Sequence, residues 1–437
     1  MPVVGRGIVI MDFKADMLYR PHFGSNWDNG AKCGSRSSNW NNPALNLNSN
    51  NGSQGVTDTG ATPQGAYPTA EHIGLARVPN IQQGLCRVSS QGESPVEHLM
   101  KRHGNLWSKI ITTENIALAY KKARKGKGWQ HKVQNFEKNL EDNLENIRQS
   151  LIEKSFTTSE YRVKEVYEPK QRTIYILPFA PDRIVQHAVM NVLEPIWNSM
   201  MIEDSYACRQ GKGQHSASRR TMQWVRKYKY CFQADVKKFY PSINHDILMN
   251  IVRRKIKDPD VLWLLEDIIY SIPGDNNVPI GNYTSQWLGN LYLNELDMYV
   301  KHQLREKAYL RYNDDFVIFG NDKQKLHEQR NNIRCFLKYN LDLTMSKDKV
   351  LPVFQGLDFV GYRHFPNKIL LRKRTAKRVK KKIDSIPYLL KTGAISPESA
   401  LSSIASTQGW LQWANTHNLS IALQLEKLKG EVNELCT

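Results

Sequence analysis

The sequence predicts an α+β fold in which short antiparallel strands carry acidic residues at their ends. Two apolar runs, Tyr309–Tyr312 and Phe316–Phe319, are separated by a tight Asn-Asp turn, which is typical of a β-hairpin. A third strand-like run, Tyr230–Ala234, stops at Asp235. Amphipathic helical segments stand before, between and after these strands, whereas the N-terminal part shows neither period.

The composition indicates a nucleic-acid-binding protein. Among 437 residues, 61 Lys and Arg stand against 42 Asp and Glu, a formal net charge of +19. Such an excess indicates a polyanionic partner, nucleic acid before a membrane surface. No run of about 18 apolar residues occurs, so no membrane-spanning helix is expected. The N-terminus lacks the pattern of a secretory signal, and we expect a cytoplasmic protein.

The N-terminal extension, residues 1–95, differs from the rest. Its segment Phe23–Gly60 is rich in Asn, Ser and Gly, which predicts an irregular chain. The string NWDNGAKCGSRSSNWNNPALNLN in this segment resembles the Asn-rich end of C-type-lectin-type variable proteins that retroelements diversify. On that resemblance the extension is a translated template repeat, and the functional protein starts near Met100.

Helices are predicted over residues 105–128, with a start near Thr112, and over 134–153. A strand-rich segment, 161–177, follows and carries Lys170 and Arg172 at a turn or strand edge. Two cations there can bind a triphosphate, or they can be ordinary solvated charges on an edge. The next predicted helix, Ile184–Glu194, carries His187 as a packed residue.

Three carboxylates are the candidate centre of the chemistry. Asp314 and Asp315 lie side by side at the hairpin tip, and Asp235 ends another strand. If an antiparallel sheet brings these ends together, their repulsion favours a bound divalent cation, and oxygen-only ligands suit Mg²⁺. Two Mg²⁺ ions about 3.5–4 Å apart, or Mn²⁺ in their place, can activate a 3′-hydroxyl and stabilise a leaving pyrophosphate. A solvated turn is the alternative interpretation.

The strings ADVKKFYPSI, which contains Asp235, and YNDD at 312–315 resemble the palm of a reverse transcriptase. The resemblance implies a right-hand polymerase with fingers (96–230), a palm of antiparallel sheet and helices (231–365) and a helical thumb (366–437). It also implies template RNA, a DNA or RNA primer and deoxynucleoside triphosphates as substrates.

The resemblance assigns roles to single residues. Asp235, Asp314 and Asp315 are implied to be catalytic and, with Val236, to hold the metal ions. In KQRTIYIL, Lys170 and Arg172 are implied to bind the incoming triphosphate. On the segment that follows the hairpin, two lysines compete for one role. Lys349 in MSKDKV resembles the lysine that assists pyrophosphate departure, and Lys347 competes with it.

Tyr240 and the segment FVGY at 359–362 complete the resemblance. FVGY resembles the primer-grip hairpin. In the family, an aromatic residue at the position of Tyr240 packs under the sugar and excludes a 2′-hydroxyl by steric clash. A core aromatic residue beside Pro241 is the alternative interpretation.

The segment VPIGNYTSQ, residues 278–286, indicates which subgroup of reverse transcriptases the chain resembles. Most reverse transcriptases have Gln-Gly and Ser-Pro where this chain has Ile280-Gly281 and Ser285-Gln286. That difference resembles the enzymes of diversity-generating retroelements, which make adenine-mutagenic cDNA from a template-repeat RNA. Ile280, Gly281 and Gln286 are then nucleotide-binding residues, and Gly281 allows close backbone approach. A simply packed Ile280 is the alternative.

The C-terminal part is strongly basic. Residues 368–382 read KILLRKRTAKRVKKK and are predicted to continue as a helix to about Lys391. Almost no acidic side chains lie nearby to form ion pairs with these cations. The cations are therefore expected to contact template and primer phosphates. The expected nucleic-acid-binding residues are Arg372, Lys373, Arg374, Lys377, Arg378 and Lys381. Helices over 397–415 and 419–435 follow, with Trp410 and Trp413 in the core.

The sequence therefore predicts an RNA-directed DNA polymerase that makes cDNA for mutagenic retrohoming. The resemblance implies a small basic accessory protein as a partner. A retron, intron-type or antiviral-defence reverse transcriptase is the alternative enzyme, and a non-catalytic RNA-binding scaffold is the alternative outside enzymes.

Overall fold

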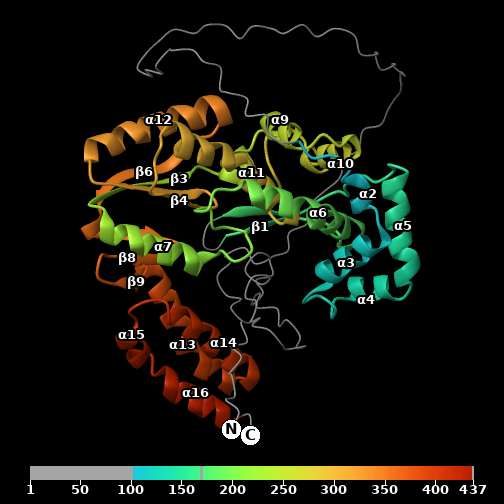
Figure 1. Ribbon diagram of the computed structural model, residues 1–437. Helices are drawn as coiled ribbons and strands as arrows, with labels where there is room; N and C mark the ends of the chain where they lie inside the picture. Colours follow the sequence, from blue (N-terminus) through green and yellow to red (C-terminus); the bar gives the residue numbers. More distant parts are fainter. Residues whose placement is uncertain (1–101, 168–170, 436–437) are drawn as a thin grey trace, which may run out of the picture. The chain divides into compact units, whose positions relative to one another are not determined.

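The computed structural model describes residues 102–167 and 171–435. Helices and antiparallel strands are mixed along this part of the chain, which confirms the predicted α+β class (Figure 1). The strands form a two-stranded, a four-stranded and a three-stranded sheet. The predicted N-terminal extension, residues 1–95, and the predicted triphosphate ligand Lys170 lie outside the described residues.

The first helical group packs against a longer helix from later in the chain. Its members are α2 (Trp107–Ile110), α3 (Thr113–Arg124), α4 (His131–Glu137) and α5 (Leu140–Ile152), and α2 and α3 contact α6 (Ile184–Met200). Thr112 caps α3 by accepting a hydrogen bond from the backbone N–H of Asn115, which confirms the predicted start. The single helix predicted over 134–153 is wrong, because Asn139 leaves helical geometry (φ −128°, ψ 56°) and separates α4 from α5.

A hairpin connects this group to α6. Its strands, β1 (Arg162–Val166) and β2 (Arg172–Ile176), confirm the strand-rich segment, and the irregular turn η1 (Phe179–Arg183) follows. Helix α6 begins at Ile184 as predicted but runs past Glu194 to Met200, with Pro195 inside it. His187 is buried and stacks on the ring of Tyr283 at 4.5 Å between centroids, so it is the packed residue that was expected.

Strands from three separate parts of the chain meet in the central sheet. Its order is β4-β5-β3-β6, with every neighbouring pair antiparallel. The strands are β3 (Tyr230–Val236), β4 (Tyr309–Tyr312), β5 (Asp315–Gly320) and β6 (Met345–Pro352). Strands β4 and β5 are the predicted hairpin, and Asn313 in its turn has a positive φ of 57°, a conformation that Asn tolerates well.

The two faces of the central sheet lie in different cores. Because strand side chains alternate, Phe232 and Ile318 lie in the core that includes α6, α9, α11 and α12, whereas Cys231 and Val317 lie in a second core with α7 and the C-terminal elements. Figure 1 shows α12 and α7 on opposite sides of the sheet. The elements around it are α7 (Gln214–Lys227), α8 (Phe239–Ser242), α9 (His245–Lys255), α10 (Pro259–Ile269), α11 (Tyr283–Met298), η2 (Tyr299–Gln303) and α12 (Lys323–Leu341).

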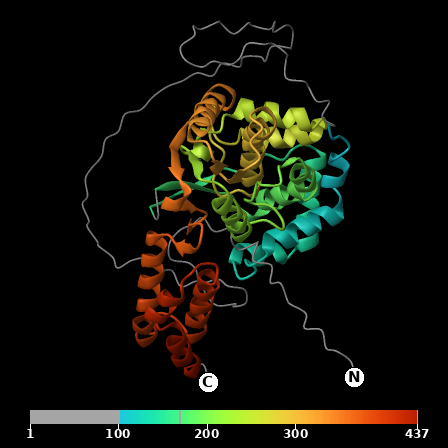
Figure 2. The ribbon, with the colours of Figure 1, turned by 60° about the vertical axis from the view of Figure 1, so that its left-hand side comes forward.

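The C-terminal elements form a small sheet and a helical group, drawn together at one end of Figure 2. They are η3 (Val353–Gln355), β7 (Leu357–Phe359), β8 (Tyr362–His364), β9 (Ile369–Leu371), α13 (Lys373–Lys391), α14 (Pro397–Leu411), α15 (His417–Ala422) and α16 (Leu425–Glu434). The basic helix ends at Lys391 as predicted. The predicted helix over 397–415 ends earlier, at Leu411, and that over 419–435 is interrupted at Gln424, whose φ is 48°.

No helix within residues 102–167 and 171–435 combines the length and the apolar character needed to cross a bilayer.

Candidate active site

The register of the central sheet brings the three predicted catalytic carboxylates to one edge. Asp235, the penultimate residue of β3, pairs directly with Asp315, the first residue of β5. Asp314 stands one residue earlier, in the β4–β5 turn, and its backbone carbonyl accepts a hydrogen bond from the N–H of Val236 at 3.3 Å. Residues that are far apart in the sequence therefore share one corner of the sheet, as the carboxylate pattern predicted.

The electrostatics of Asp314 reflect its burial and its neighbouring carboxylates. Burial, reinforced by the negative charges of Asp315 and Asp235, raises the pKa of Asp314 to about 7. A carboxyl group in this state is poorly stabilised as an anion unless a cation comes near it. The positive charge of Arg172, at the start of β2, acts against this rise, so this predicted triphosphate ligand lies within electrostatic reach of the same corner.

The donor set fits a hard divalent cation. The three predicted aspartate ligands offer carboxylate oxygen, which Mg²⁺ and Mn²⁺ prefer over nitrogen- or sulfur-rich sets. Across the described ranges, no three acidic, histidine or cysteine side chains already enclose a space for an ion.

Lys347, rather than Lys349, lies beside the carboxylates. On β6, Lys347 pairs with Asp235 and its ammonium nitrogen is 3.8 Å from Asp235 Oδ2. Lys349 pairs with Gln233, which places it one pleat repeat, about 7 Å, further along the strand. A bulge interrupts this register between Asp235 and Val236, and Ser346 within it donates to Asp235 Oδ2 at 3.1 Å.

Tyr240 lies against the catalytic turn. Its hydroxyl donates to Asn313 Oδ1 at 3.2 Å, and burial raises its pKa well above the usual value, so the phenol stays protonated. Its ring packs beside Phe239 and close to the backbone of Gly289 on α11. An added Cβ at Gly289 would lie 3.1 Å from both rings. The absence of a side chain at Gly289 therefore leaves room for the Tyr240 ring.

The segment at Ile280 and Gly281 joins β2. The carbonyl of Ile280 accepts a hydrogen bond from the N–H of Tyr175 at 2.9 Å. Gly281 has a φ of 127°, and a Cβ there would lie 2.4 Å from the carbonyl oxygen of Tyr175. The close backbone approach that Gly281 makes in the structure is to β2. Its predicted approach to a nucleotide stays a prediction. Gln286 follows in the first turn of α11.

Arg311 is a residue that the sequence analysis missed. Its guanidinium is completely buried, binds both carboxylate oxygens of Asp297 at 2.8 and 2.6 Å, and donates to the backbone carbonyl of Asn313 at 3.0 Å. The side chain of Asn290 accepts a further bond at 3.0 Å. A charged residue in the middle of the apolar strand YLRY was the available signal, since such a residue needs a buried partner.

The hairpin of β7 and β8, the predicted primer grip, is fixed at its tip. Gln214 on α7 donates to the carbonyl of Val360 at 2.7 Å, and a Cβ on Gly361 would lie 2.8 Å from the ring of Trp410. Gln233 on β3 donates to the carbonyl of Asp358 at 2.6 Å, which attaches this hairpin to the face of the central sheet that carries Asp235.

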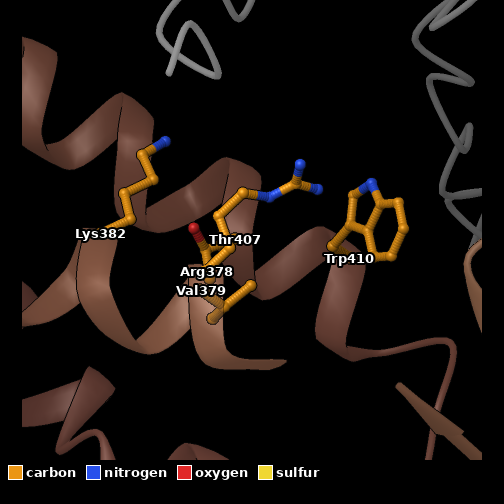
Figure 3. Close-up of a pocket in the computed structure, with 5 residues that line it drawn as sticks. All are labelled: Arg378, Val379, Lys382, Thr407 and Trp410. Carbon is orange, nitrogen blue, oxygen red and sulfur yellow. The ribbon is translucent and has the colours of Figure 1, made fainter. Parts of the chain in front are cut away.

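Helix α13 has one apolar face and one basic face. Thr375, Val379 and Ile383 are buried at helical spacing. The expected nucleic-acid ligands on the other face are exposed or half-buried in the structure: Arg372, Lys373, Arg374, Lys377, Arg378 and Lys381. Figure 3 shows Arg378 and Lys382 of α13 with Trp410 of α14, lining a hollow between the two helices. Trp410 is buried, as predicted for a core residue.

Comparisons with known proteins found one family model and several relatives that resemble parts of this chain. Residues 164–364 match the family model described as reverse transcriptase (RNA-dependent DNA polymerase). The chain is 28% identical over 275 residues to protein YkfC of Escherichia coli, which covers 51% of this chain and 70% of YkfC. It is 26% identical over 172 residues to the group II intron-encoded protein LtrA of Lactococcus lactis, covering 37% of this chain and 28% of LtrA. It is 22% identical over 163 residues to nuclear intron maturase 4 of Arabidopsis thaliana, covering 35% and 20%. The chain thus spans less than a third of the two intron proteins.

Proposed function

Because the chain is a reverse transcriptase, that is, an RNA-directed DNA polymerase, we propose that Asp235, Asp314 and Asp315 form its nucleotidyl-transfer centre. The observation that carries the proposal is the β3–β5 register, which sets Asp235 opposite Asp315 beside the crowded carboxyl of Asp314. On this assignment the central sheet belongs to a palm, residues 231–365, the preceding segment 96–230 to fingers and the helices of 366–437 to a thumb.

The residues around the carboxylates divide the work of the reaction. Asp235, Asp314 and Asp315, with the neighbouring backbone of Val236, would hold two Mg²⁺ ions, for which Mn²⁺ can substitute. When bound, the ions activate the primer 3′-hydroxyl and stabilise the charge of the departing pyrophosphate. Arg172, with Lys170 from outside the described residues, binds the triphosphate through charge-assisted hydrogen bonds. Lys347, with Lys349 one repeat further, supplies a proton to the pyrophosphate as it leaves.

A primer-extension assay tests this function. The full chain should extend a DNA or RNA primer on an RNA template with deoxynucleoside triphosphates, and only when Mg²⁺ or Mn²⁺ is present. Binding of the primed template without any extension in either metal would contradict the enzyme and favour the RNA-binding scaffold.

We further propose that the cDNA is mutagenic at template adenines. The support is the Ile280-Gly281 pair, whose backbone is bound at Tyr175 to the strand β2 that begins with Arg172, and the Asn-rich string of residues 26–48. An apolar Ile280 offers no hydrogen bond that could report the geometry of the nascent pair. A small basic accessory protein is the proposed partner. An intron-type enzyme is the second candidate, because LtrA and maturase 4 are intron proteins by name.

Ile280→Gln should lower the error frequency opposite adenine, because the amide restores polar contacts that penalise mispairs. Sequencing of cDNA made in vitro from a defined RNA measures the frequency at each template base. Ile280→Val, which keeps an apolar side chain, is the matched control and should keep the original spectrum. Equal adenine errors in the Gln variant and the unaltered protein would remove Ile280 from the explanation.

Tyr240→Val should increase incorporation of ribonucleotides relative to deoxyribonucleotides, because removal of the ring opens room for the 2′-hydroxyl. Single-nucleotide extension with each triphosphate gives the ratio of kcat/KM values. Tyr283→Val, at a ring that stacks on His187 instead of lying at the catalytic turn, is the control and should leave the ratio near that of the unaltered protein. An unchanged ratio in Tyr240→Val would show that the ring does not exclude the ribose.

Lys377→Glu combined with Lys381→Glu should weaken binding of a primed RNA template by about tenfold or more at moderate salt, because two phosphate contacts are replaced by repulsion. The dependence of log Kd on log salt should become shallower by roughly two. Lys323→Glu with Lys338→Glu on α12 makes the same charge change on exposed residues at the other face of the central sheet. If both pairs weaken binding equally, only net charge matters and α13 has no special role.

A further inference from the structure

The amide of Asn313 bridges two groups that the proposed reaction uses separately. Its Oδ1 accepts a hydrogen bond from the Tyr240 hydroxyl at 3.2 Å, and its Nδ2 donates to Asp314 Oδ1 at 3.1 Å. The sugar-facing ring and a metal-binding carboxylate are therefore connected through one rigid, planar group. The sequence analysis predicted only that Asn313 lies in the turn of the hairpin.

The backbone of Asn313 is tied to a buried ion pair. Its carbonyl accepts a hydrogen bond from Arg311, and Arg311 binds the buried carboxylate of Asp297 through Nε and Nη2. Tyr309 also donates to Asp297 at 2.6 Å. With the turn backbone held in place, a displacement of the Tyr240 ring moves the side-chain amide of Asn313.

The position of the Tyr240 ring is also restricted by its neighbours. Gly289 lies against its ring, and Phe239 packs beside it with 5.1 Å between ring centroids. A group that pushes on the exposed part of the ring has to move the hydroxyl as well, because the ring is rigid. That movement lengthens the bond to Asn313 Oδ1 and rotates Nδ2 away from Asp314.

We propose that Asn313 is a positioning residue that couples the sugar contact of Tyr240 to the placement of the Asp314 carboxylate. The inference rests on the proposed polymerase function and deepens it. A deoxyribose leaves the relay intact, so Asp314 is held for reaction. A ribose displaces the Tyr240 ring, and the relay then disturbs Asp314. Discrimination against ribonucleotides is consequently expressed in kcat as well as in KM.

The test measures kcat and KM for a deoxyribonucleotide and its ribonucleotide with the full chain on a primed RNA template. Asn313→Gly removes the amide and keeps the left-handed backbone that glycine adopts easily. Tyr240→Phe removes the hydroxyl and keeps the ring. Each variant should reduce the kcat ratio between the two sugars by about fivefold, the value of one ordinary hydrogen bond, while the KM ratio stays close to that of the unaltered protein. The double variant should lose no more than either single one.

Two further variants make the result specific. Asn313→Asp keeps the oxygen that accepts from Tyr240 but cannot donate to Asp314, so it should reproduce the loss of Asn313→Gly. Asn105→Gly is the matched control at another left-handed asparagine (φ 55°), on the loop before α2, and should leave both ratios as they were. Thermal unfolding of each variant confirms that it is folded, and Tyr240→Phe decides the question if the Asn313 variants do not fold.

Full retention of the kcat ratio in Tyr240→Phe and Asn313→Gly would overturn the coupling, as would losses that multiply in the double variant. If the unaltered protein incorporates no deoxyribonucleotide at all, the polymerase function itself fails and this inference fails with it. If Tyr240→Val leaves ribose discrimination unchanged while extension is normal, the sugar contact fails alone.

Discussion

Asp314→Asn should reduce nucleotide incorporation by roughly a thousandfold or more, because a metal-binding carboxylate supplies several kcal/mol of transition-state stabilisation. Asp235→Asn should behave in the same way, since the two residues face one corner of the sheet. Single-turnover extension on a primed RNA template measures the loss. Asp142→Asn, at an exposed carboxylate on α5, is the matched control and should extend primers normally.

Stability separates this loss of activity from a loss of fold. The folded-state pKa of Asp314 is raised to about 7, above the ordinary value of about 3.9, so its ionisation opposes folding as the pH rises between these values. At pH 8 without divalent metal, Asp314→Asn should therefore melt at the same temperature as the unaltered protein or higher. Near pH 4 the advantage should disappear. A variant that is both inactive and markedly less stable at pH 8 would contradict this assignment.

Arg311→Met should destabilise the protein by about 3–5 kcal/mol, because it leaves the Asp297 carboxylate buried without its cation. Both side chains are completely buried, so water cannot replace the lost contacts. Urea unfolding measures the change in free energy. The double variant Arg311→Met with Asp297→Leu should recover much of the loss, since it removes both charges together.

The exposed ion pair of Arg253 and Glu266 supplies the comparison. Both side chains are more than 40% exposed, and Arg253→Met should cost about 1 kcal/mol or less. If Arg311→Met costs no more than Arg253→Met, the buried network does not hold the catalytic turn in the manner described. The recovered double variant should still extend primers poorly, because it lacks the donor to the Asn313 carbonyl.

Local signals were sufficient to predict the centre of the site. The β4–β5 hairpin follows from two apolar runs and a two-residue turn, and the position of Asp235 follows from the end of a short apolar strand. Each of these depends on residues close together in the sequence. The meeting of Asp235 with Asp315 was predicted because the ends of antiparallel strands can share one edge of a sheet.

Features that depend on distant contacts were not predictable in the same way. The choice between Lys347 and Lys349 depends on the register in which β6 pairs with β3, which no local pattern indicates. The breaks at Asn139 and Gln424 arise where single residues adopt non-helical angles inside otherwise helical patterns.

The residue that Gly281 approaches is Tyr175, whose backbone carbonyl belongs to β2. This contact is visible only in the folded chain.

The most direct test of the central claim counts the ions at this corner of the sheet. The full chain is bound to an RNA template with a dideoxy-terminated primer and the next deoxynucleotide, and bound Mn²⁺ is measured by electron paramagnetic resonance. The account predicts about two ions per chain in the unaltered protein and fewer in Asp235→Asn and Asp314→Asn. The same number of tightly bound ions in all three proteins would show that these carboxylates do not hold the metal.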